Sequence, residues 1–148
     1  MIDTDEMYMK KALAEARKAM CNDEVPVGSI ITHNNKIIAK AHNLTIQLCD
    51  PTAHAEMQAI TAACNHLQSR YLDKCTLYTT LEPCIMCASA LFWAKIGKVV
   101  YGADDKKRGM SYVDMNILHK KTILKKNILM HECGGLLTEF FKKKRKLK

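Results

Sequence analysis

Apolar residues recur near the start of the chain with the spacing of an amphipathic helix. Met9, Leu13, Ala16 and Met20 lie three or four positions apart, with charged residues between them. This pattern predicts an opening helix with one buried face and one charged face. The segment VGSIITHNNKIIAKAHN (27–43) then contains two β-branched runs around an Asn-Asn pair, which predicts a hairpin of two strands.

Helix and strand patterns alternate through the middle of the chain. Thr52, which follows a proline, can cap a helix that runs to about Leu67. A strand is predicted in CTLYTTL (75–81), then a helix that opens with proline in PCIMCASALFWAKI (83–96), then a strand in KVVYGAD (98–104). This order predicts a mixed sheet covered by helices, which is a three-layer α/β domain.

The pattern is weaker in the last third of the chain. Lys107, Arg108 and Gly109 precede scattered apolar residues, so residues 106–127 are predicted to form a loop with a short helix. The segment ECGGLLTEFFKKKRK (132–146) predicts a closing helix. Its apolar residues are expected to face inward: Leu136, Leu137, Phe140 and Phe141. Phe140 and Phe141 could instead stack on nucleic-acid bases, with core packing expected for at least one of them.

Length and composition limit the class of protein. The chain has 148 residues, 48% hydrophobic and 26% charged, and we find no internal repeat or linker, so we expect one domain over residues 1–148. No apolar run reaches the roughly 18 residues of a membrane span. The N-terminus lacks the basic-then-apolar layout of a secretory signal. We therefore expect a cytoplasmic protein with no membrane partner.

The positive charge is concentrated at the C-terminus. The formal net charge is +8, and the basic tail (142–148) supplies +6 of it. A solvated helix end and a phosphate-binding segment both fit this run, since lysines near a nucleic-acid backbone add salt-dependent affinity. The nucleic-acid-binding candidates are Lys142, Lys143, Lys144 and Arg145.

Cysteine usage favours metal chemistry over disulfides. Seven cysteines are an odd number in a chain without an export signal. His54, in HAE (54–56), and the pair Cys84 and Cys87, in PCIMC (83–87), each stand where a helix is predicted to begin. One imidazole and two thiolates are a zinc set that leaves a fourth position open, as catalytic sites do. The other five cysteines are expected mostly as buried apolar residues.

The spacing of these residues has a physical reason. Cys84 and Cys87 lie on one face of a first helical turn, where the positive end of the helix dipole favours their thiolate forms. Glu56 is two residues from His54, so its side chain points elsewhere and suits a proton shuttle. The alternative is a closed structural zinc site completed by Cys64, Cys75 or Cys133, which would leave Glu56 unexplained.

These motifs resemble the His-Ala-Glu and Pro-Cys-x-x-Cys signature of zinc nucleobase deaminases. Within that superfamily the chain resembles the bacterial tRNA-specific adenosine deaminases from its first helix to its last. The segments that carry this resemblance are EVPVG (24–28), AHN ending at Asn43, DPTAHAE (50–56), LEPCIMC (81–87) and FFKKKRK (140–146). The resemblance implies a cytidine deaminase-like α/β/α fold with about five strands in a mixed sheet, and a homodimer.

The resemblance also implies a reaction and its residues. The substrate would be the wobble adenosine of a tRNA anticodon loop, hydrolysed at C6 to inosine and ammonia. One Zn²⁺ per subunit would be held by His54, Cys84 and Cys87. Glu56 would protonate N1 of the base and then the departing amine. The substrate-binding residues would be Asn43, which bonds the base, the backbone of Ala55, which contacts its edge, and Val25 and Leu81, which form an apolar wall.

One segment departs from that family. Bacterial tRNA members commonly carry Gly-Ala-Ala-Gly-Ser after the strand that corresponds to VVYGAD, whereas this chain reads DDKKRGMSYVDMNILHKK (104–121). Asp104 and Asp105 are expected in a strand-end turn or a substrate loop. The change motivates a second function, which is deamination of a free nucleobase or nucleoside such as guanine or cytosine. A third function, a non-catalytic RNA-binding module with a structural zinc, is a separate alternative.

Overall fold

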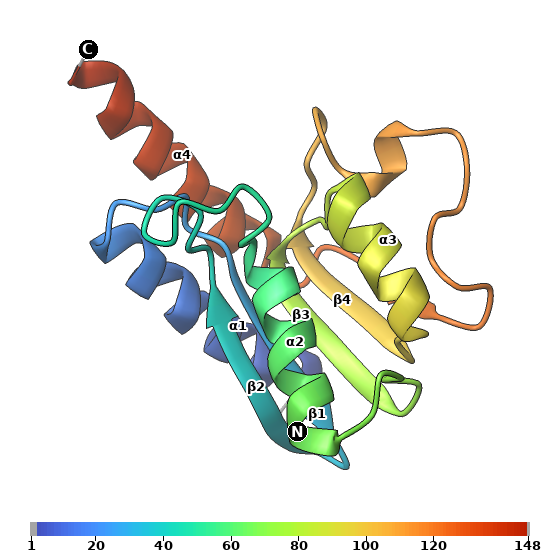
Figure 1. The fold of residues 1–148 in the computed structure, drawn as a ribbon. Helices are drawn as coiled ribbons and strands as arrows, with labels where there is room; N and C mark the ends of the chain where they lie inside the picture. The colour runs from blue at the N-terminus through green and yellow to red at the C-terminus, as the bar shows by residue number, and fades with distance from the viewer. Residues whose placement is uncertain (1–2, 148) are drawn as a thin grey trace.

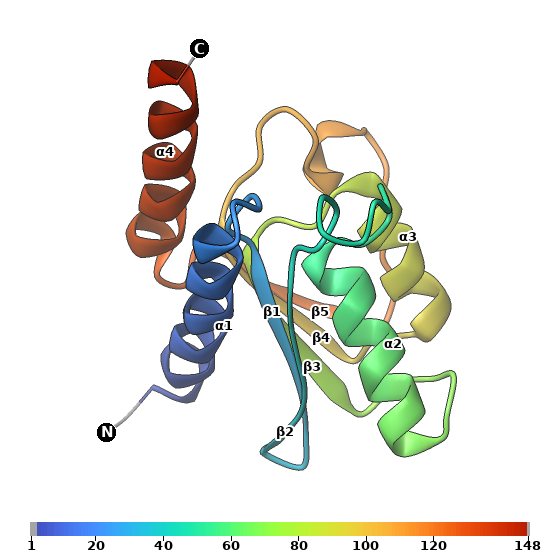
Figure 2. The ribbon, with the colours of Figure 1, turned by 60° about the vertical axis from the view of Figure 1, so that its left-hand side comes forward.

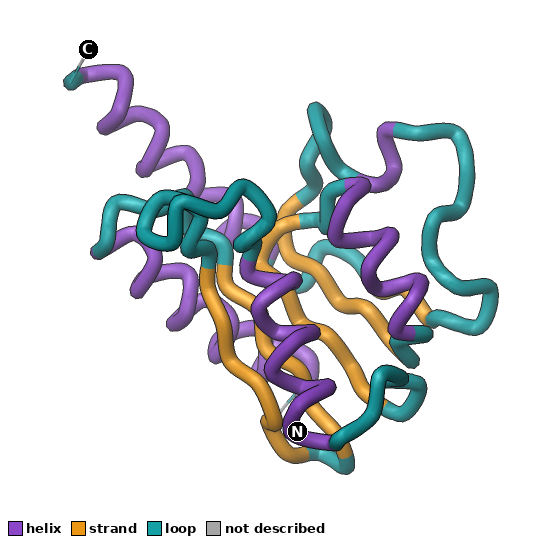
Figure 3. The backbone as a smooth tube through the Cα atoms, viewed as in Figure 1, coloured by secondary structure: helices purple, strands orange, loops and turns teal. Residues whose placement is uncertain are grey.

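The computed structural model describes residues 3–147, which contain four α-helices and five strands (Figure 1). Figure 3 shows the helices and strands along the backbone and the long loop that follows β4. In chain order the elements are α1 (Thr4–Cys21), β1 (Gly28–His33), β2 (Lys36–His42), α2 (Ala55–Leu67), β3 (Cys75–Leu81), α3 (Ile85–Ala94), β4 (Lys98–Ala103), a 3₁₀ turn (Met110–Tyr112), β5 (Ile123–Lys125) and α4 (Met130–Lys146).

The strands form one mixed sheet in the order β2-β1-β3-β4-β5. Strand β1 is antiparallel to both β2 and β3, whereas β4 is parallel to both β3 and β5. The α/β fold with a five-stranded sheet is therefore confirmed. The hydrophobic pattern did not predict β5, because this strand has only three residues and all three are exposed.

The helices lie in two layers on opposite faces of the sheet, α2 and α3 on one and α1 and α4 on the other (Figures 1 and 2). Neighbouring residues of a strand point to opposite faces. Each central strand therefore supplies both hydrophobic cores. Against α1 and α4 lie Ile30, Tyr78 and Val100, and against α2 and α3 lie Ile31, Leu77 and Val99.

The predicted hairpin between β1 and β2 is confirmed. Asn34 and Asn35 both have left-handed backbone angles, with φ of 52° and 60°, as a tight two-residue turn requires. At the other end of β1, the strand runs against α1 so closely that a Cβ on Gly28 would overlap the carbonyl oxygen of Ala12. Glycine is therefore required where the hairpin begins.

The predicted cap of α2 is wrong. The Asp50 carboxylate accepts hydrogen bonds from both the backbone N–H and the hydroxyl of Thr52, at 2.8 and 2.7 Å, so Thr52 belongs to a turn before the helix. The helix begins at Ala55, and His54 occupies its N-cap with extended backbone angles. This shift places the His54 ring at the N-terminus of α2.

The closing helix differs from its prediction in one side chain. Phe140 is buried at 7% exposure, Leu136 and Leu137 are half-buried, but Phe141 is 44% exposed. Neighbouring residues of an α-helix point about 100° apart, so both phenylalanines cannot face one core. The basic residues 142–146 continue the helix, and Lys148 lies outside the described residues. Across residues 3–147, no helix combines the length and the apolar character needed to cross a membrane.

Candidate active site

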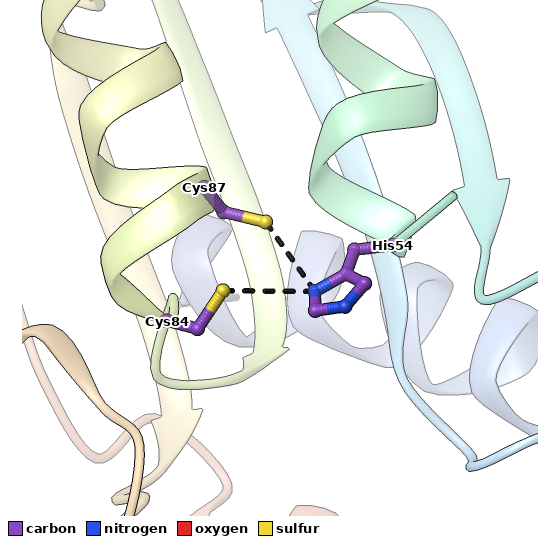
Figure 4. A group of neighbouring side chains, drawn as sticks. All are labelled: His54, Cys84 and Cys87. Atoms are coloured by element: carbon purple, nitrogen blue, oxygen red, sulfur yellow. Dashed lines mark hydrogen bonds between the residues drawn. The ribbon is translucent and has the colours of Figure 1, made fainter. Parts of the chain in front are cut away.

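Two helix starts bring the three predicted metal ligands together. His54 is the N-cap of α2, Cys84 is the N-cap of α3, and Cys87 lies in the first turn of α3. Both sulfur atoms point toward the imidazole ring (Figure 4). The distance from His54 Nδ1 is 3.6 Å to Cys84 Sγ and 3.6 Å to Cys87 Sγ. The three ligand atoms all lie within 4.8 Å of one another.

This spacing fits zinc. A tetrahedral ion with a Zn–N distance of about 2.05 Å and a Zn–S distance of about 2.3 Å separates nitrogen from sulfur by about 3.6 Å. That is the separation observed here. When bound, zinc activates water as a nucleophile at neutral pH. The donor set of one imidazole and two thiols therefore supports the zinc cofactor predicted from the sequence.

The closed structural site is not supported. Among residues 3–147, no other His, Cys, Asp or Glu joins the three ligands in a metal-binding group. Cys64 packs against the core under α2 and α3, and Cys75 is buried within that core. Cys133 is buried in the core on the other face of the sheet. The fourth coordination position is therefore left without a protein ligand.

Of the five cysteines that are not metal ligands, two are fully buried, so the prediction that most of them are buried is only partly confirmed. Cys75 and Cys133 are buried and Cys64 is half-buried, but Cys21 and Cys49 are exposed. Cys21 is the last residue of α1, and Cys49 lies in the loop between β2 and α2. Their positions at the surface explain the difference, because neither reaches a core.

The two thiols ionise differently when no cation neutralises them. A hydrogen bond with Cys87, assisted by His54, lowers the pKa of Cys84 to about 4. The same contact and burial raise the pKa of Cys87, because the negative charge already resides on its neighbour. A bound divalent cation would favour the thiolate form of both.

Glu56 lies in the first turn of α2 with only 4% of its surface exposed. Burial raises its pKa to about 7, and the nearby Cys84 thiolate adds to this effect. A carboxyl group with this pKa exchanges protons readily near neutral pH. It is not a member of the metal-binding group, but it lies beside that group, since its carboxylate accepts a hydrogen bond from the Cys87 thiol.

A cavity of about 240 Å³ opens in front of these residues. It collects all of the predicted catalytic and substrate-binding residues, namely Glu56, Asn43, Ala55, Val25 and Leu81. His54, Cys84, Val27, Glu82, Asp105 and Arg108 complete its lining. We call this cavity the inner pocket. The structure brings these residues together, and their roles in catalysis and binding stay predictions.

The Asn43 side chain is held in place at the inner pocket. Its amide Nδ2 donates to the carbonyl oxygen of Val25 at 3.5 Å, and its Oδ1 accepts from the backbone N–H of Thr45 at 3.4 Å. Its own backbone N–H donates to the carbonyl oxygen of Val27 at 3.1 Å. These bonds join the EVPVG segment to the end of β2, so the pocket wall and Asn43 form one unit.

A larger hollow of about 700 Å³, the outer groove, lies beside the inner pocket and shares Val25, Leu81, Asp105 and Arg108 with it. One side is the segment after β4 and the other is α4. The residues that line the groove alone are Asp104, Lys106, Lys107, Leu137, Phe141, Lys144 and Arg145. Five cationic side chains and two acidic ones therefore line it.

The outer groove separates the four predicted nucleic-acid contacts into two kinds. Lys144 and Arg145 line it, whereas Lys142 and Lys143 do not. Lys143 forms an ion pair with Glu139 at 3.6 Å. The difference follows from helical geometry, because four consecutive residues of α4 point in all directions around its axis.

Sequence reasoning missed Glu82. Its carboxylate is 2% exposed and accepts the backbone N–H of Asp105 at 3.0 Å through Oε1. Oε2 accepts the backbone N–H and the hydroxyl of Ser111, at 2.9 and 2.6 Å. A charged residue between an apolar strand and the Pro-Cys helix start was the available signal. Glu82 fixes both ends of the segment from Asp105 to Ser111.

The strand-end turn predicted for Asp104 and Asp105 is confirmed. Asp104 accepts the hydroxyl of Tyr101 at 2.9 Å. Asp105 accepts the backbone N–H groups of Lys107 and Arg108, at 3.1 and 3.0 Å. Both carboxylates therefore stabilise the turn that follows β4. Arg108 itself was not predicted as a site residue, although it stands in the segment that was expected to depart from the family pattern.

Comparisons with known proteins agree with this geometry. The family model of the cytidine and deoxycytidylate deaminase zinc-binding region matches residues 2–103, which include all three zinc ligands. A tRNA-specific adenosine deaminase of Aquifex aeolicus is 49% identical over 144 residues, which is 95% of each chain.

Two solved structures are also similar. One comes from a study of A-to-I editing by tRNA:A34 deaminases and has a TM-score of 0.83 and 37% identity over 88% of this chain and 99% of its own. The other, a guanine deaminase from Bacillus subtilis, has a TM-score of 0.65 and 40% identity over 67% of this chain and 64% of its own. The chain therefore belongs to the zinc-binding cytidine and deoxycytidylate deaminase family, and it is a zinc-dependent hydrolytic deaminase.

Proposed function

We propose that this deaminase converts adenosine to inosine at the wobble position of tRNA. The main support for this proposal is that the inner pocket and the outer groove adjoin each other. A pocket with a zinc ligand set and a buried glutamate opens into a groove lined by five cationic side chains. Similar proteins named for tRNA adenosine deamination support the same substrate.

Glu56 is the proton carrier in this proposal. It transfers a proton to N1 of the base and later to the departing amine, so it must both accept and release protons. A pKa of about 7 suits both steps. His54, Cys84 and Cys87 hold one Zn²⁺ per subunit, and no further His, Cys, Asp or Glu of residues 3–147 joins this ligand group.

The other pocket residues bind the base. Asn43 hydrogen-bonds it, the backbone of Ala55 contacts its edge, and Val25 and Leu81 form the apolar wall against its faces. All four line the inner pocket, and Ala55 is fully buried. Because hydrogen bonds at both ends of its side chain hold Asn43, little conformational entropy is lost on binding.

The anticodon loop suits this architecture. A deaminase can reach only an unstacked base, and an anticodon loop presents one at small energetic cost. The base would enter the inner pocket while the phosphates follow the outer groove. Lys106, Lys107, Lys144 and Arg145 are the phosphate contacts in this arrangement. Since the substrate is a tRNA, we place the protein in the cytoplasm.

We further propose that residues 1–148 work as a single deaminase domain and that the active form is a homodimer. Large apolar side chains are exposed on α3 and in the loop after β4. Trp93 is 75% exposed, Tyr112 68% and Met115 70%, and such surface commonly marks an interface. Sedimentation of Trp93→Asp against the unaltered protein tests this. A lower mass for the variant supports a dimer through this face, and equal masses argue against it.

The function is tested with a substrate panel. Zinc-loaded protein is incubated with a tRNA that carries adenosine at the wobble position, and separately with free bases and nucleosides. Mass spectrometry then detects the change from amine to carbonyl. Inosine in the tRNA is the expected result. Survival of the wobble adenosine in the presence of active enzyme would overturn the proposal.

Deamination of a free base is the second candidate, favoured by the similarity to a guanine deaminase and by the divergent segment after β4. It predicts turnover of a small substrate that does not change when residues 142–148 are deleted. A non-catalytic RNA-binding module is disfavoured, because the chain belongs to a deaminase family and the buried Glu56 carboxyl lines the inner pocket beside the metal site.

A further inference from the structure

Arg108 is the one cationic residue that lines both the inner pocket and the outer groove among residues 3–147. Lys106, Lys107, Lys144 and Arg145 line the groove only. Arg108 therefore stands where the space for a base meets the space for a polynucleotide backbone. It belongs to the segment in which this chain departs from the family pattern.

The guanidinium of Arg108 is available to a ligand. The residue is exposed, and no Asp or Glu within the described chain lies at ion-pair distance from it. By contrast, Lys144 forms an ion pair with Asp23 at 2.6 Å. A planar guanidinium without a partner matches the geometry of a phosphate group, to which it can donate two parallel hydrogen bonds.

The backbone that carries Arg108 is fixed. Asp105 accepts the Arg108 backbone N–H, and Glu82 holds the segment from both ends, at Asp105 and Ser111. Next to it, a Cβ on Gly109 would overlap the Glu82 carboxylate, so the turn is packed directly on that side chain. Gly109 also bridges to the zinc ligand Cys84 through the backbone. The position of Arg108 is therefore set relative to the metal site.

A nucleic-acid substrate places a phosphate at this junction. When a base occupies the inner pocket, its glycosidic bond leaves the ribose at the pocket mouth, and the two flanking phosphates lie just outside. We propose that Arg108 binds a phosphate that flanks the target nucleotide and so makes the enzyme select a polynucleotide over a free base. This inference rests on the proposed function and names the residue that determines its substrate class.

The test is a double-mutant cycle, in which one side chain of the protein and one phosphate of the RNA are altered singly and together. Anticodon stem-loop RNAs are prepared with a neutral methylphosphonate linkage on the 5′ or the 3′ side of the wobble adenosine. Each is compared with the unmodified RNA on the unaltered protein, Arg108→Gln and Lys36→Gln. Lys36 is an exposed lysine at the start of β2, at the hairpin turn, and lines neither hollow, so it controls for loss of one positive charge.

Arg108→Gln is expected to raise KM about ten-fold with little change in kcat, since it removes one charge-assisted contact to phosphate. The slope of the logarithm of the RNA-binding constant against the logarithm of the salt concentration should fall in magnitude by about 0.7 to 0.9. One of the two methylphosphonates should raise the KM of the unaltered protein by the same factor and should not raise the KM of Arg108→Gln any further. Lys36→Gln should behave like the unaltered protein throughout.

The inference would be overturned if each methylphosphonate raised KM by the same factor for Arg108→Gln as for the unaltered protein. The loss of the side chain and the loss of the phosphate charge would then act independently. The same cycle is also measured as binding affinity by fluorescence anisotropy, so it does not depend on turnover. If the unaltered protein binds the RNA but never converts its adenosine, the proposed function fails, whereas the coupling at Arg108 is still measured.

Discussion

The Ser111 hydroxyl donates a 2.6 Å hydrogen bond to the buried carboxylate of Glu82. This contact joins the junction of β3 and α3, which carries two zinc ligands, to the segment that forms one side of the outer groove. The metal site and the segment from Asp105 to Ser111 are therefore mechanically connected. A change at Glu82 should reach the substrate without changing a metal ligand.

Glu82→Gln keeps the size of the side chain but loses its charge and part of its accepting capacity. Hydrogen bonds to a charged group are each worth about 1.5–3 kcal/mol, so the segment from Asp105 to Ser111 should loosen. We expect faster trypsin cleavage at residues 106–108 and a kcat/KM on tRNA about ten-fold lower, with zinc content unchanged. Glu139→Gln, an exposed glutamate of α4, is the control. Equal cleavage rates for the two variants would contradict this account.

Removal of a zinc ligand should destabilise the fold. In Cys87→Ser the hydroxyl is a poor zinc ligand, and metal binding is coupled to folding, so zinc content and melting temperature should fall together. Cys21→Ser replaces an exposed cysteine and should change neither quantity. A chelator should lower the melting temperature of the unaltered protein and leave that of Cys87→Ser unchanged. Full zinc retention by Cys87→Ser would show that the assigned ligand set is wrong.

Asp5 should contribute stability that depends on pH. Burial would raise its pKa, but hydrogen bonds from Lys125 at 2.6 Å and Tyr78 at 2.9 Å, with the charge of Lys98, outweigh burial and lower it below 3.8. The folded state therefore binds fewer protons than the unfolded state, and the stabilisation is complete above pH 3.8 and lost as pH falls through the folded pKa.

Asp5→Asn tests this pH dependence by chemical denaturation. At pH 7 it should lower the free energy of unfolding by about 1–3 kcal/mol, and the difference from the unaltered protein should shrink in acid. Asp114→Asn removes an exposed carboxylate that forms no ion pair within residues 3–147, so it should not change the free energy of unfolding at pH 7 or in acid. If Asp5→Asn lowered the free energy of unfolding by the same amount at pH 7 and in acid, the charge of Asp5 would be ruled out as the cause.

Two cationic residues of α4 should differ in their contribution to tRNA binding, because only one of them lines the outer groove. Arg145 lines the groove and Lys142 does not. Arg145→Gln should weaken tRNA binding and lower the magnitude of its log–log salt slope by about 0.7 to 0.9, since one phosphate contact is lost. Lys142→Gln removes the same charge from the same helix and should have a much smaller effect. Identical losses would show that only the overall charge of the C-terminal end matters.

The sequence was most informative where chemistry depends on local spacing. Cys84 and Cys87 are one helical turn apart at a predicted helix start, and HAE begins another, so the metal site could be predicted without a structure. Strand β3 was predicted with its observed bounds because its apolar residues stand between clear turn signals. The resemblance to known deaminases supplied the fifth strand.

The remaining features depend on contacts between distant segments. Glu82 accepts from residues more than twenty positions away, and Arg108 meets the inner pocket only after the chain folds back over Cys84. The pattern could not show that Asp50 would bind Thr52 and delay the start of α2. Nor could it decide which of Phe140 and Phe141 faces the core, since that depends on how α4 is rotated against the sheet.

The rate of inosine formation by Glu56→Gln shows whether this carboxyl group carries the proton in the reaction. This variant keeps the size of the buried side chain but cannot carry the proton. It is compared with the unaltered protein at equal zinc content, on the same tRNA with wobble adenosine. We expect a rate about 10²–10⁴-fold lower with zinc retained, because general acid–base catalysis is lost. Conversion by Glu56→Gln at the rate of the unaltered protein would contradict this role of Glu56.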